Sequence, residues 1–167
     1  MKTHQIVGYG SLLSHASLKK TIPDRPVQPV IVRGYKRIFN VLANNHTDVL
    51  NIVKKSGGYF NGVLFTVNVE ELKQIKQREQ PQYQFRRSWA YDFDTGRKIS
   101  LALLAIDLRH SLDHQNHEPN LLYLKSCREA AYAISKKFGQ MWDDTTYTAD
   151  SEKISRWIKE NKDYLLI

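Results

Sequence analysis

The sequence predicts a single α+β domain in which a curved, mixed and mostly antiparallel β-sheet forms a barrel-like core flanked by helices. Segments rich in β-branched and aromatic residues fill the first two-thirds of the 167 residues. Apolar residues at helical spacing then dominate the C-terminal third. No repeat, low-complexity tract or linker divides residues 1–167, and a chain of this length can bury one sizeable core.

The strands are expected where apolar runs are bounded by Gly, Pro, Asn and Asp. These runs cover residues 4–9, 30–41, 49–54, 59–68, 84–94 and 98–106. Gly57-Gly58 separates two of them and Asp94-Thr95-Gly96 separates two others, so each pair is expected to form a hairpin. Adjacent strands are therefore expected to be antiparallel.

Helical spacing occurs in residues 69–76, 120–138 and 151–161. Asn68 and Asn120 are candidate caps of the first two helices, because their side chains can accept a hydrogen bond from a free amide of the first turn. Gly139 is expected to end the second helix, and Pro81 to end the first. Glu79 then falls at the C-terminal end of the first helix.

Composition excludes several classes of protein. Hydrophobic residues make up 41% of the chain and charged residues 25%, and no apolar run approaches the roughly 20 residues needed to cross a bilayer. The apolar run after Met1 is too short for a signal peptide, and a single cysteine, Cys127, excludes an intramolecular disulfide. We therefore expect a cytoplasmic protein with no membrane partner.

The net charge of +8 raises the question of nucleic-acid binding. The basic pairs are, however, scattered along the chain, which argues against a nucleic-acid partner and favours solvated surface charges. A positive field also suits the capture of a small anionic substrate. The pairs are Lys19-Lys20, Lys36-Arg37, Lys54-Lys55, Arg86-Arg87 and Lys136-Lys137.

Two short segments carry candidate chemistry. Near the N-terminus a strand breaks at Gly8, Gly10 and Ser11, where glycines permit φ > 0 and let backbone N–H groups converge on a carboxylate or oxyanion. The alternative is an ordinary connection between a strand and a helix. Glu79 lies at a helix C-terminus, where the macrodipole disfavours an ionised carboxylate, and burial would raise its pKa further. The alternative there is an exposed surface glutamate.

The chain resembles the γ-glutamylcyclotransferase-like family along nearly its whole length. Tyr9-Gly10-Ser11-Leu12 is similar to the family's substrate-binding loop, and Glu79 falls where the family carries its catalytic glutamate. The segment 32–39 resembles the second strand, residues 118–123 resemble the Pro-Ser-x-x-Tyr segment, and Phe138-Gly139 resembles the end of the long helix. Leu12 matches the ChaC-like and bacterial branches, whereas Asn120 replaces a Ser and Gln80 replaces a Gly of the family pattern.

The resemblance implies an enzyme that cyclises a γ-glutamyl group to 5-oxoproline and releases the attached amine or peptide. It implies Glu79 as the catalytic proton carrier, and it requires no metal or organic cofactor. The substrate would be a small anionic γ-glutamyl compound. Its binding residues would be Tyr9, Gly10, Ser11, Leu12, Leu13 and Tyr123, although Tyr123 would also suit a packing role.

Other functions remain as alternatives. The same scaffold would also suit a non-catalytic module that binds a γ-glutamyl-like ligand, or a basic module that binds nucleic acid. His110, His114 and His117 have spacing that would suit a metal site on a helix, but their segment lacks apolar periodicity and is expected to be a solvated loop. Ser11 lacks the G-x-S-x-G elbow of a hydrolase.

Overall fold

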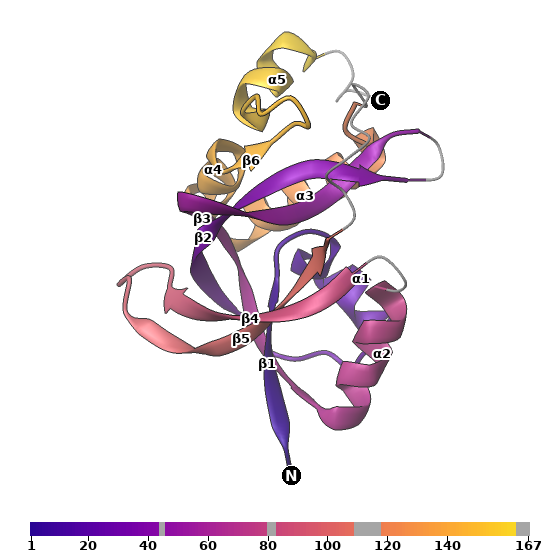
Figure 1. The fold of residues 1–167 in the computed structure, drawn as a ribbon, viewed down its shortest axis with the longest axis vertical. Coiled ribbons are helices and arrows are strands. Elements are labelled where there is room, and N and C mark those ends of the chain that lie inside the picture. Colours follow the sequence, from indigo (N-terminus) through magenta and orange to yellow (C-terminus); the bar gives the residue numbers. More distant parts are fainter. Residues whose placement is uncertain (44–45, 80–82, 109–117, 163–167) are drawn as a thin grey trace.

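The computed structural model describes residues 1–43, 46–79, 83–108 and 118–162, and its core is one mixed β-sheet (Figure 1). The six strands follow the order β3-β1-β5-β4-β2-β6, and a further pairing of β3 with β2 closes the first five into a barrel. The strands are β1 (Thr3–Gly8), β2 (Gln28–Leu42), β3 (Asp48–Asn68), β4 (Tyr83–Asp92), β5 (Lys98–Asp107) and β6 (Thr146–Tyr147).

The pairing is mostly antiparallel, as expected. β1 lies antiparallel to β3 with Ile6 opposite Phe65, but parallel to β5 with Ile6 opposite Leu103. The short β6 is parallel to β2. Since a parallel neighbour requires a crossover connection, these two parallel pairings make the sheet mixed and bring the start of the chain into its middle.

The two predicted hairpins had different outcomes. Asp94-Thr95-Gly96 does join antiparallel strands, with Gly96 at φ +70° and the Asp92 carboxylate accepting from the Thr95 amide at 2.7 Å. The hairpin at Gly57-Gly58 is wrong, because β3 runs through it as a single strand. The register with β2 shifts between Arg33 and Tyr35, so that residues 55–58 form a bulge, which uses the same positive φ as a turn.

The helices are η1 (Ser11–Leu13), α1 (His15–Lys19), α2 (Val69–Glu79), α3 (Leu121–Ile134), α4 (Lys136–Asp144) and α5 (Ile154–Glu160). The two predicted asparagine caps are confirmed: Asn68 Oδ1 accepts from the Glu71 amide at 2.9 Å, and Asn120 Oδ1 from the Tyr123 amide at 3.0 Å. Pro81 and Gln80 lie outside the described residues. In Figure 1, α1 and α2 lie together beside the barrel, whereas α4, β6 and α5 lie at the opposite end, along the β2–β3 ribbon.

The predicted helix over residues 120–138 is in fact two helices. Ser135 is extended at φ −168° and caps α4 by accepting from the Phe138 amide at 3.0 Å. Gly139 therefore lies inside α4 and does not end a helix. A Cβ at Gly139 would lie 2.4 Å from the Tyr132 ring, so the glycine is needed for close packing of α3 against α4.

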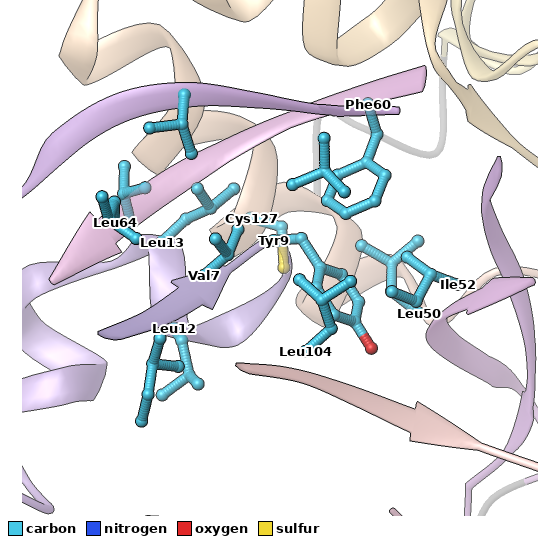
Figure 2. Packing of buried hydrophobic residues seen from close by; sticks show 14 of the residues in the cluster. Val7, Tyr9, Leu12, Leu13, Leu50, Ile52, Phe60, Leu64, Leu104 and Cys127 are labelled. Carbon is cyan, nitrogen blue, oxygen red and sulfur yellow. The ribbon is translucent and has the colours of Figure 1, made fainter. Parts of the chain in front are cut away.

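The core fills the barrel and the space between the barrel and α3. Figure 2 shows Tyr9, Leu50, Phe60 and Leu104 gathered on one side of this core, with the Cys127 thiol behind them. Phe60 and Leu104 are fully buried, and Trp142 of α4 extends the same cluster. Within the described residues no helix is long and apolar enough to cross a bilayer.

Arg37 corrects the expectation that the basic pairs are solvated. Its side chain is fully buried, and its guanidinium donates to five neutral oxygens. These are the carbonyl and side-chain oxygens of Asn61, the Trp142 carbonyl, and the hydroxyls of Thr145 and Thr146. Burial lowers the pKa of Arg37 to about 9. Lys36-Arg37 thus contributes one surface charge, which weakens the nucleic-acid alternative.

Candidate active site

The N-terminal loop connects β1 to η1 by two glycines that are needed for close approach. A Cβ at Gly8 would lie 2.7 Å from Leu12 Cβ, and one at Gly10 would lie 2.4 Å from the Tyr123 hydroxyl. Gly10 has φ −124°, so the expected positive φ is not what this loop uses. The glycines allow the loop to pack directly against η1 and α3.

The loop leaves backbone donors without partners. The amide of Leu13 donates to the Gly10 carbonyl at 3.0 Å, as the turn of η1 requires. Among the described residues, the amides of Gly10, Ser11 and Leu12 have no hydrogen-bond acceptor. Three successive free donors at the start of a helical turn are the kind of groups that can bind an anion, so the role of this loop in binding stays a prediction that the geometry permits.

Leu13 differs from the rest of the predicted loop. Its side chain is buried among apolar residues, where Figure 2 shows it near Leu64, and it does not line the cavity described below. Its amide is also occupied within η1. The structure therefore gives Leu13 a packing role beside the loop.

Glu79 ends α2 with its side chain only 16% exposed, which is not the exposed surface glutamate of the alternative interpretation. Burial raises the pKa of its carboxyl above the usual 4.5. The charge of Arg78, whose Nε lies 3.7 Å from Glu79 Oε1, partly opposes this rise. No described residue donates a hydrogen bond to the Glu79 carboxylate. A carboxyl group with a raised pKa and free oxygens is suited to proton transfer.

Arg78 is a residue that the sequence interpretation missed. Its guanidinium donates to the carbonyl and hydroxyl of Ser17 at 2.8 and 2.6 Å, to Thr21 Oγ1 at 3.0 Å and to Ser11 Oγ at 3.1 Å. It thereby ties the end of α2 to α1 and to the N-terminal loop. An arginine beside an acidic residue is common in helices, so only the three-dimensional contacts reveal this link.

Tyr123 stands opposite the loop, at the start of α3. The start of α3 is fixed to β3, because the Asp48 amide donates to Glu118 O at 2.9 Å and the Asn120 amide donates to Asp48 O at 2.8 Å. The Tyr123 ring packs edge-on against Phe39, with 6.2 Å between centroids. Burial raises the pKa of the Tyr123 hydroxyl well above 10, so this group is a neutral donor.

Two further tyrosines complete the surroundings. Tyr9 donates to the Ala105 carbonyl, and Tyr83, which the sequence interpretation missed, donates to the Leu50 carbonyl at 2.8 Å. Burial raises the pKa of both hydroxyls, and the charge of Glu79 contributes to each rise. Their hydroxyls are fixed by backbone acceptors, so both side chains act as rigid walls around Glu79.

These residues meet around one cavity of about 30 Å³. Tyr9, Gly10, Ser11, Leu12, Glu79 and Tyr123 all line it, so the structure brings together every predicted site residue except Leu13. The remaining wall is mainly apolar and includes Leu50, Tyr83 and Phe85. A volume of this size holds about two water molecules, so a larger ligand can bind here only if the lining side chains move apart.

No candidate metal centre accompanies the cavity. Within residues 1–43, 46–79, 83–108 and 118–162 there is no group of three His, Cys, Asp or Glu side chains that would hold a metal ion. His110, His114 and His117 lie outside the described residues.

Comparisons of the sequence gave no match: no protein-family model fits it, and no curated protein is similar to it. Solved structures do match. A γ-glutamyl cyclotransferase superposes with a TM-score of 0.72 at 15% identity, over 95% of this chain and 99% of that protein. A Homo sapiens protein described as uncharacterized gives 0.70 at 14% identity, over 96% and 98% of the two chains. YkqA of Bacillus subtilis gives 0.65 at 20% identity, over 84% of this chain and 52% of its own.

These three similarities cover 84–96% of this chain. At 14–20% identity they show a shared fold and do not show a shared activity. The chain therefore has the γ-glutamyl cyclotransferase-like fold.

Proposed function

We propose that this protein is a γ-glutamylcyclotransferase, which converts the γ-glutamyl group of a small anionic substrate into 5-oxoproline and releases the attached amine or peptide. One observation carries the proposal: a largely buried carboxyl group with a raised pKa shares a cavity with three unpartnered backbone amides. The similar fold of a γ-glutamyl cyclotransferase supports it.

The reaction takes two protons off the attacking nitrogen, which is an ammonium group in the substrate and a lactam N–H in 5-oxoproline, and it must protonate the departing nitrogen. The α-ammonium of the substrate first loses a proton to the Glu79 carboxylate, and the resulting amine attacks the γ-carbonyl carbon. The new C–N bond closes a five-membered ring, and the old amide C–N bond breaks as Glu79 returns its proton to the departing nitrogen. The ring nitrogen then loses its second proton to the regenerated Glu79 carboxylate, which passes that proton to the released amine or to solvent. A raised pKa suits a group that must both accept and donate this proton.

The N-terminal loop would orient the substrate. The amides of Gly10, Ser11 and Leu12 would bind the α-carboxylate or stabilise the oxyanion that develops on the γ-carbonyl oxygen. The Tyr123 hydroxyl, which lies against Gly10, would donate a further hydrogen bond. Because ring closure is intramolecular, holding the substrate in a folded conformation supplies much of the rate enhancement.

Arg78 would position both halves of this site. It donates a hydrogen bond to Ser11 Oγ on the loop and lies beside Glu79, so it holds the carboxyl group and the loop amides in fixed relative positions.

The mechanism requires neither a metal ion nor an organic cofactor. The single, buried cysteine suits a reducing compartment, and we propose a cytoplasmic location.

The proposal is tested by incubating the purified protein with γ-glutamyl dipeptides, glutathione and γ-glutamylamines, and measuring 5-oxoproline. We expect release from at least one of these classes, and no release by Glu79→Gln. Absence of 5-oxoproline from the whole panel would overturn the proposed function. Full turnover by Glu79→Gln would remove Glu79 from the mechanism.

A further inference from the structure

A second cavity lies away from Glu79, between the bulge of β3 and the segment that joins α4 to β6. It measures about 680 Å³ and has no lining residue in common with the first cavity. In Figure 1 this region is at the end of the molecule where α4, β6 and α5 meet the β2–β3 ribbon. Its charged lining residues are Lys36, Lys55, Lys153 and Asp144.

The three lysines of this basic cleft lack acidic partners. Within the described residues, no carboxylate oxygen lies within 4.0 Å of the ammonium groups of Lys36, Lys55 or Lys153. Other basic residues do have such partners, since Lys19 lies 3.1 Å from Asp24 and Arg128 Nε lies 2.9 Å from Asp143. Three lysines without ion-pair partners therefore line one hollow that has a single carboxylate residue on its wall.

Lys36 is the most constrained of the three. Its ammonium donates to Ser151 Oγ at 2.9 Å and lies over the Tyr147 ring, 4.2 Å from the centroid. Burial, together with the like charge of Lys55, lowers the pKa of Lys36. An anion in the cleft would relieve both effects, because its negative charge would offset the repulsion between the lysines and stabilise the half-buried ammonium of Lys36.

The bulge that carries Lys55 is fixed by its glycines. Gly57 has φ +73°, which non-glycine residues rarely adopt, and a Cβ at Gly58 would lie 2.7 Å from the Tyr35 carbonyl oxygen. This wall of the cleft is thus held close to β2 and its shape exists before any ligand binds. The ring of Tyr59, 49% exposed, lies on the same wall and offers an apolar face.

We propose that the basic cleft binds a phosphate-bearing small molecule, with Lys36, Lys55 and Lys153 around the phosphate. Three ammonium groups facing one carboxylate match a multiply charged anion better than a single carboxylate ligand. The lysines gather in one hollow rather than along a stripe, which favours a small molecule over a nucleic-acid strand. This site is independent of the reaction proposed for Glu79.

The test is titration of the whole protein with sodium pyrophosphate, inorganic phosphate and ADP by calorimetry at constant ionic strength. We expect pyrophosphate to bind the wild type, and the double variant Lys55→Ala/Lys153→Ala to bind it at least about tenfold more weakly. ADP and phosphate distinguish an organic phosphate ligand from the free ion. If ADP binds more tightly than pyrophosphate, the ligand is an organic phosphate whose organic part contacts the Tyr59 wall. If ADP binds equally or more weakly, the ligand is the free inorganic anion.

The matched control is Lys2→Ala/Lys125→Ala, which also removes two exposed lysines, neither of which lines the cleft. We expect this variant to bind pyrophosphate like the wild type. Equal weakening by the control and by Lys55→Ala/Lys153→Ala would show only general charge attraction and would overturn the proposal. The proposal would also be overturned if the wild type does not bind pyrophosphate at about 10 mM. It would be overturned as well if a single-stranded RNA binds more tightly than pyrophosphate at about 150 mM salt and displaces it. Release of 5-oxoproline by Lys55→Ala/Lys153→Ala should equal that of the wild type.

Discussion

Glu79 and Arg37 are both ionisable side chains that are largely buried, but they differ in the hydrogen bonds that they make. Arg37 is fully buried and gives its N–H groups to five neutral oxygen acceptors on β3, α4 and β6. Glu79 is 16% exposed, faces a cavity and receives no hydrogen bond from any described residue. One charge is hydrogen-bonded and enclosed, whereas the other has no hydrogen-bond donor among the described residues, only an ion pair with Arg78 at 3.7 Å, and lies where a ligand can reach it.

The difference separates a structural charge from a candidate catalytic one. A buried guanidinium whose three nitrogen atoms all donate to protein oxygens cross-links the elements around it, and it is not exposed to any ligand. A carboxyl group with free oxygens and a raised pKa costs stability when ionised, and proteins keep such groups mainly where they serve a function. Burial alone does not make this distinction, and the number of hydrogen-bond partners does.

The sharpest test of the comparison is Glu79→Gln. We expect kcat/KM for 5-oxoproline release to fall by about a thousandfold or more, because the amide cannot carry the proton. The free energy of unfolding should not fall, since the variant removes an unsatisfied charge. Glu129→Gln, on the exposed face of α3, is the control and should retain wild-type turnover. Loss of stability without a specific loss of turnover would make Glu79 a structural residue like Arg37.

The converse change is Arg37→Met. We expect the free energy of unfolding to fall by about 3 to 5 kcal/mol in urea titrations, because five buried oxygens lose their donor. Arg33→Met is the control: Arg33 lies on the surface over the Tyr91 ring and should cost under about 1 kcal/mol. Similar costs for the two variants would contradict the structural role of Arg37.

Arg78 connects the two kinds of charge, since it is hydrogen-bonded yet adjoins Glu79. For Arg78→Ala we expect kcat/KM to fall by about 10- to 100-fold, because the loop and the carboxyl group lose their common support. The variant also removes the charge that lowers the pKa of Glu79, so the acidic limb of the pH-rate profile should move to higher pH. Arg78→Lys should keep that limb near its wild-type position. A lower rate with an unmoved limb in Arg78→Ala would contradict the electrostatic part of the role.

A smaller effect is expected in the pH dependence of the free energy of unfolding, which tests whether the Glu79 carboxyl group is desolvated in the folded protein. Because burial raises its pKa in the folded state, the folded protein binds more protons than the unfolded chain between the unfolded value near 4.5 and the folded value. The contribution of Glu79 to stability is therefore lost as pH rises through this interval. We expect Glu79→Gln to match the wild type below the interval and to be more stable above it in urea titrations. A stability difference that does not change with pH would show that the carboxyl group is not desolvated.

The smallest effect is expected for Tyr123→Phe. Losing one neutral donor at the cavity should lower kcat/KM by about three- to tenfold, with little change in the melting temperature. Tyr132→Phe, which removes a hydroxyl bonded to Asp143 away from the cavity, is the matched control and should leave turnover unchanged. A large fall in stability with normal turnover would return Tyr123 to a packing role.

Local patterns predicted the elements that depend on neighbouring residues. Two helix caps and one turn form through contacts within three residues, so the local sequence is enough to predict them. They are the Asn68 and Asn120 caps and the Asp94-Thr95-Gly96 turn. The bulge at Gly57 was misassigned for the opposite reason. A positive φ suits both a turn and a bulge, and only the length and register of the partner strand β2 decide between them. The break at Ser135 is itself a local cap to the Phe138 amide, and it was missed because apolar residues at helical spacing continue on both sides of it.

The sequence by itself determined the α+β class and the place of Glu79 at the end of a helix, because short-range periodicity and helix-ending residues set these features. The loop from Tyr9 to Leu12 was located by its resemblance to a family pattern, and its backbone does not use the positive φ that its glycines suggested. Only the tertiary structure decided which charges are satisfied. Arg37 and Lys36 are neighbours in the chain, yet one is sealed among five acceptors and the other lines an open cleft. The physical reason is that solvation and hydrogen bonding depend on residues brought together from distant segments, as Arg37 is with Asn61 and Thr146.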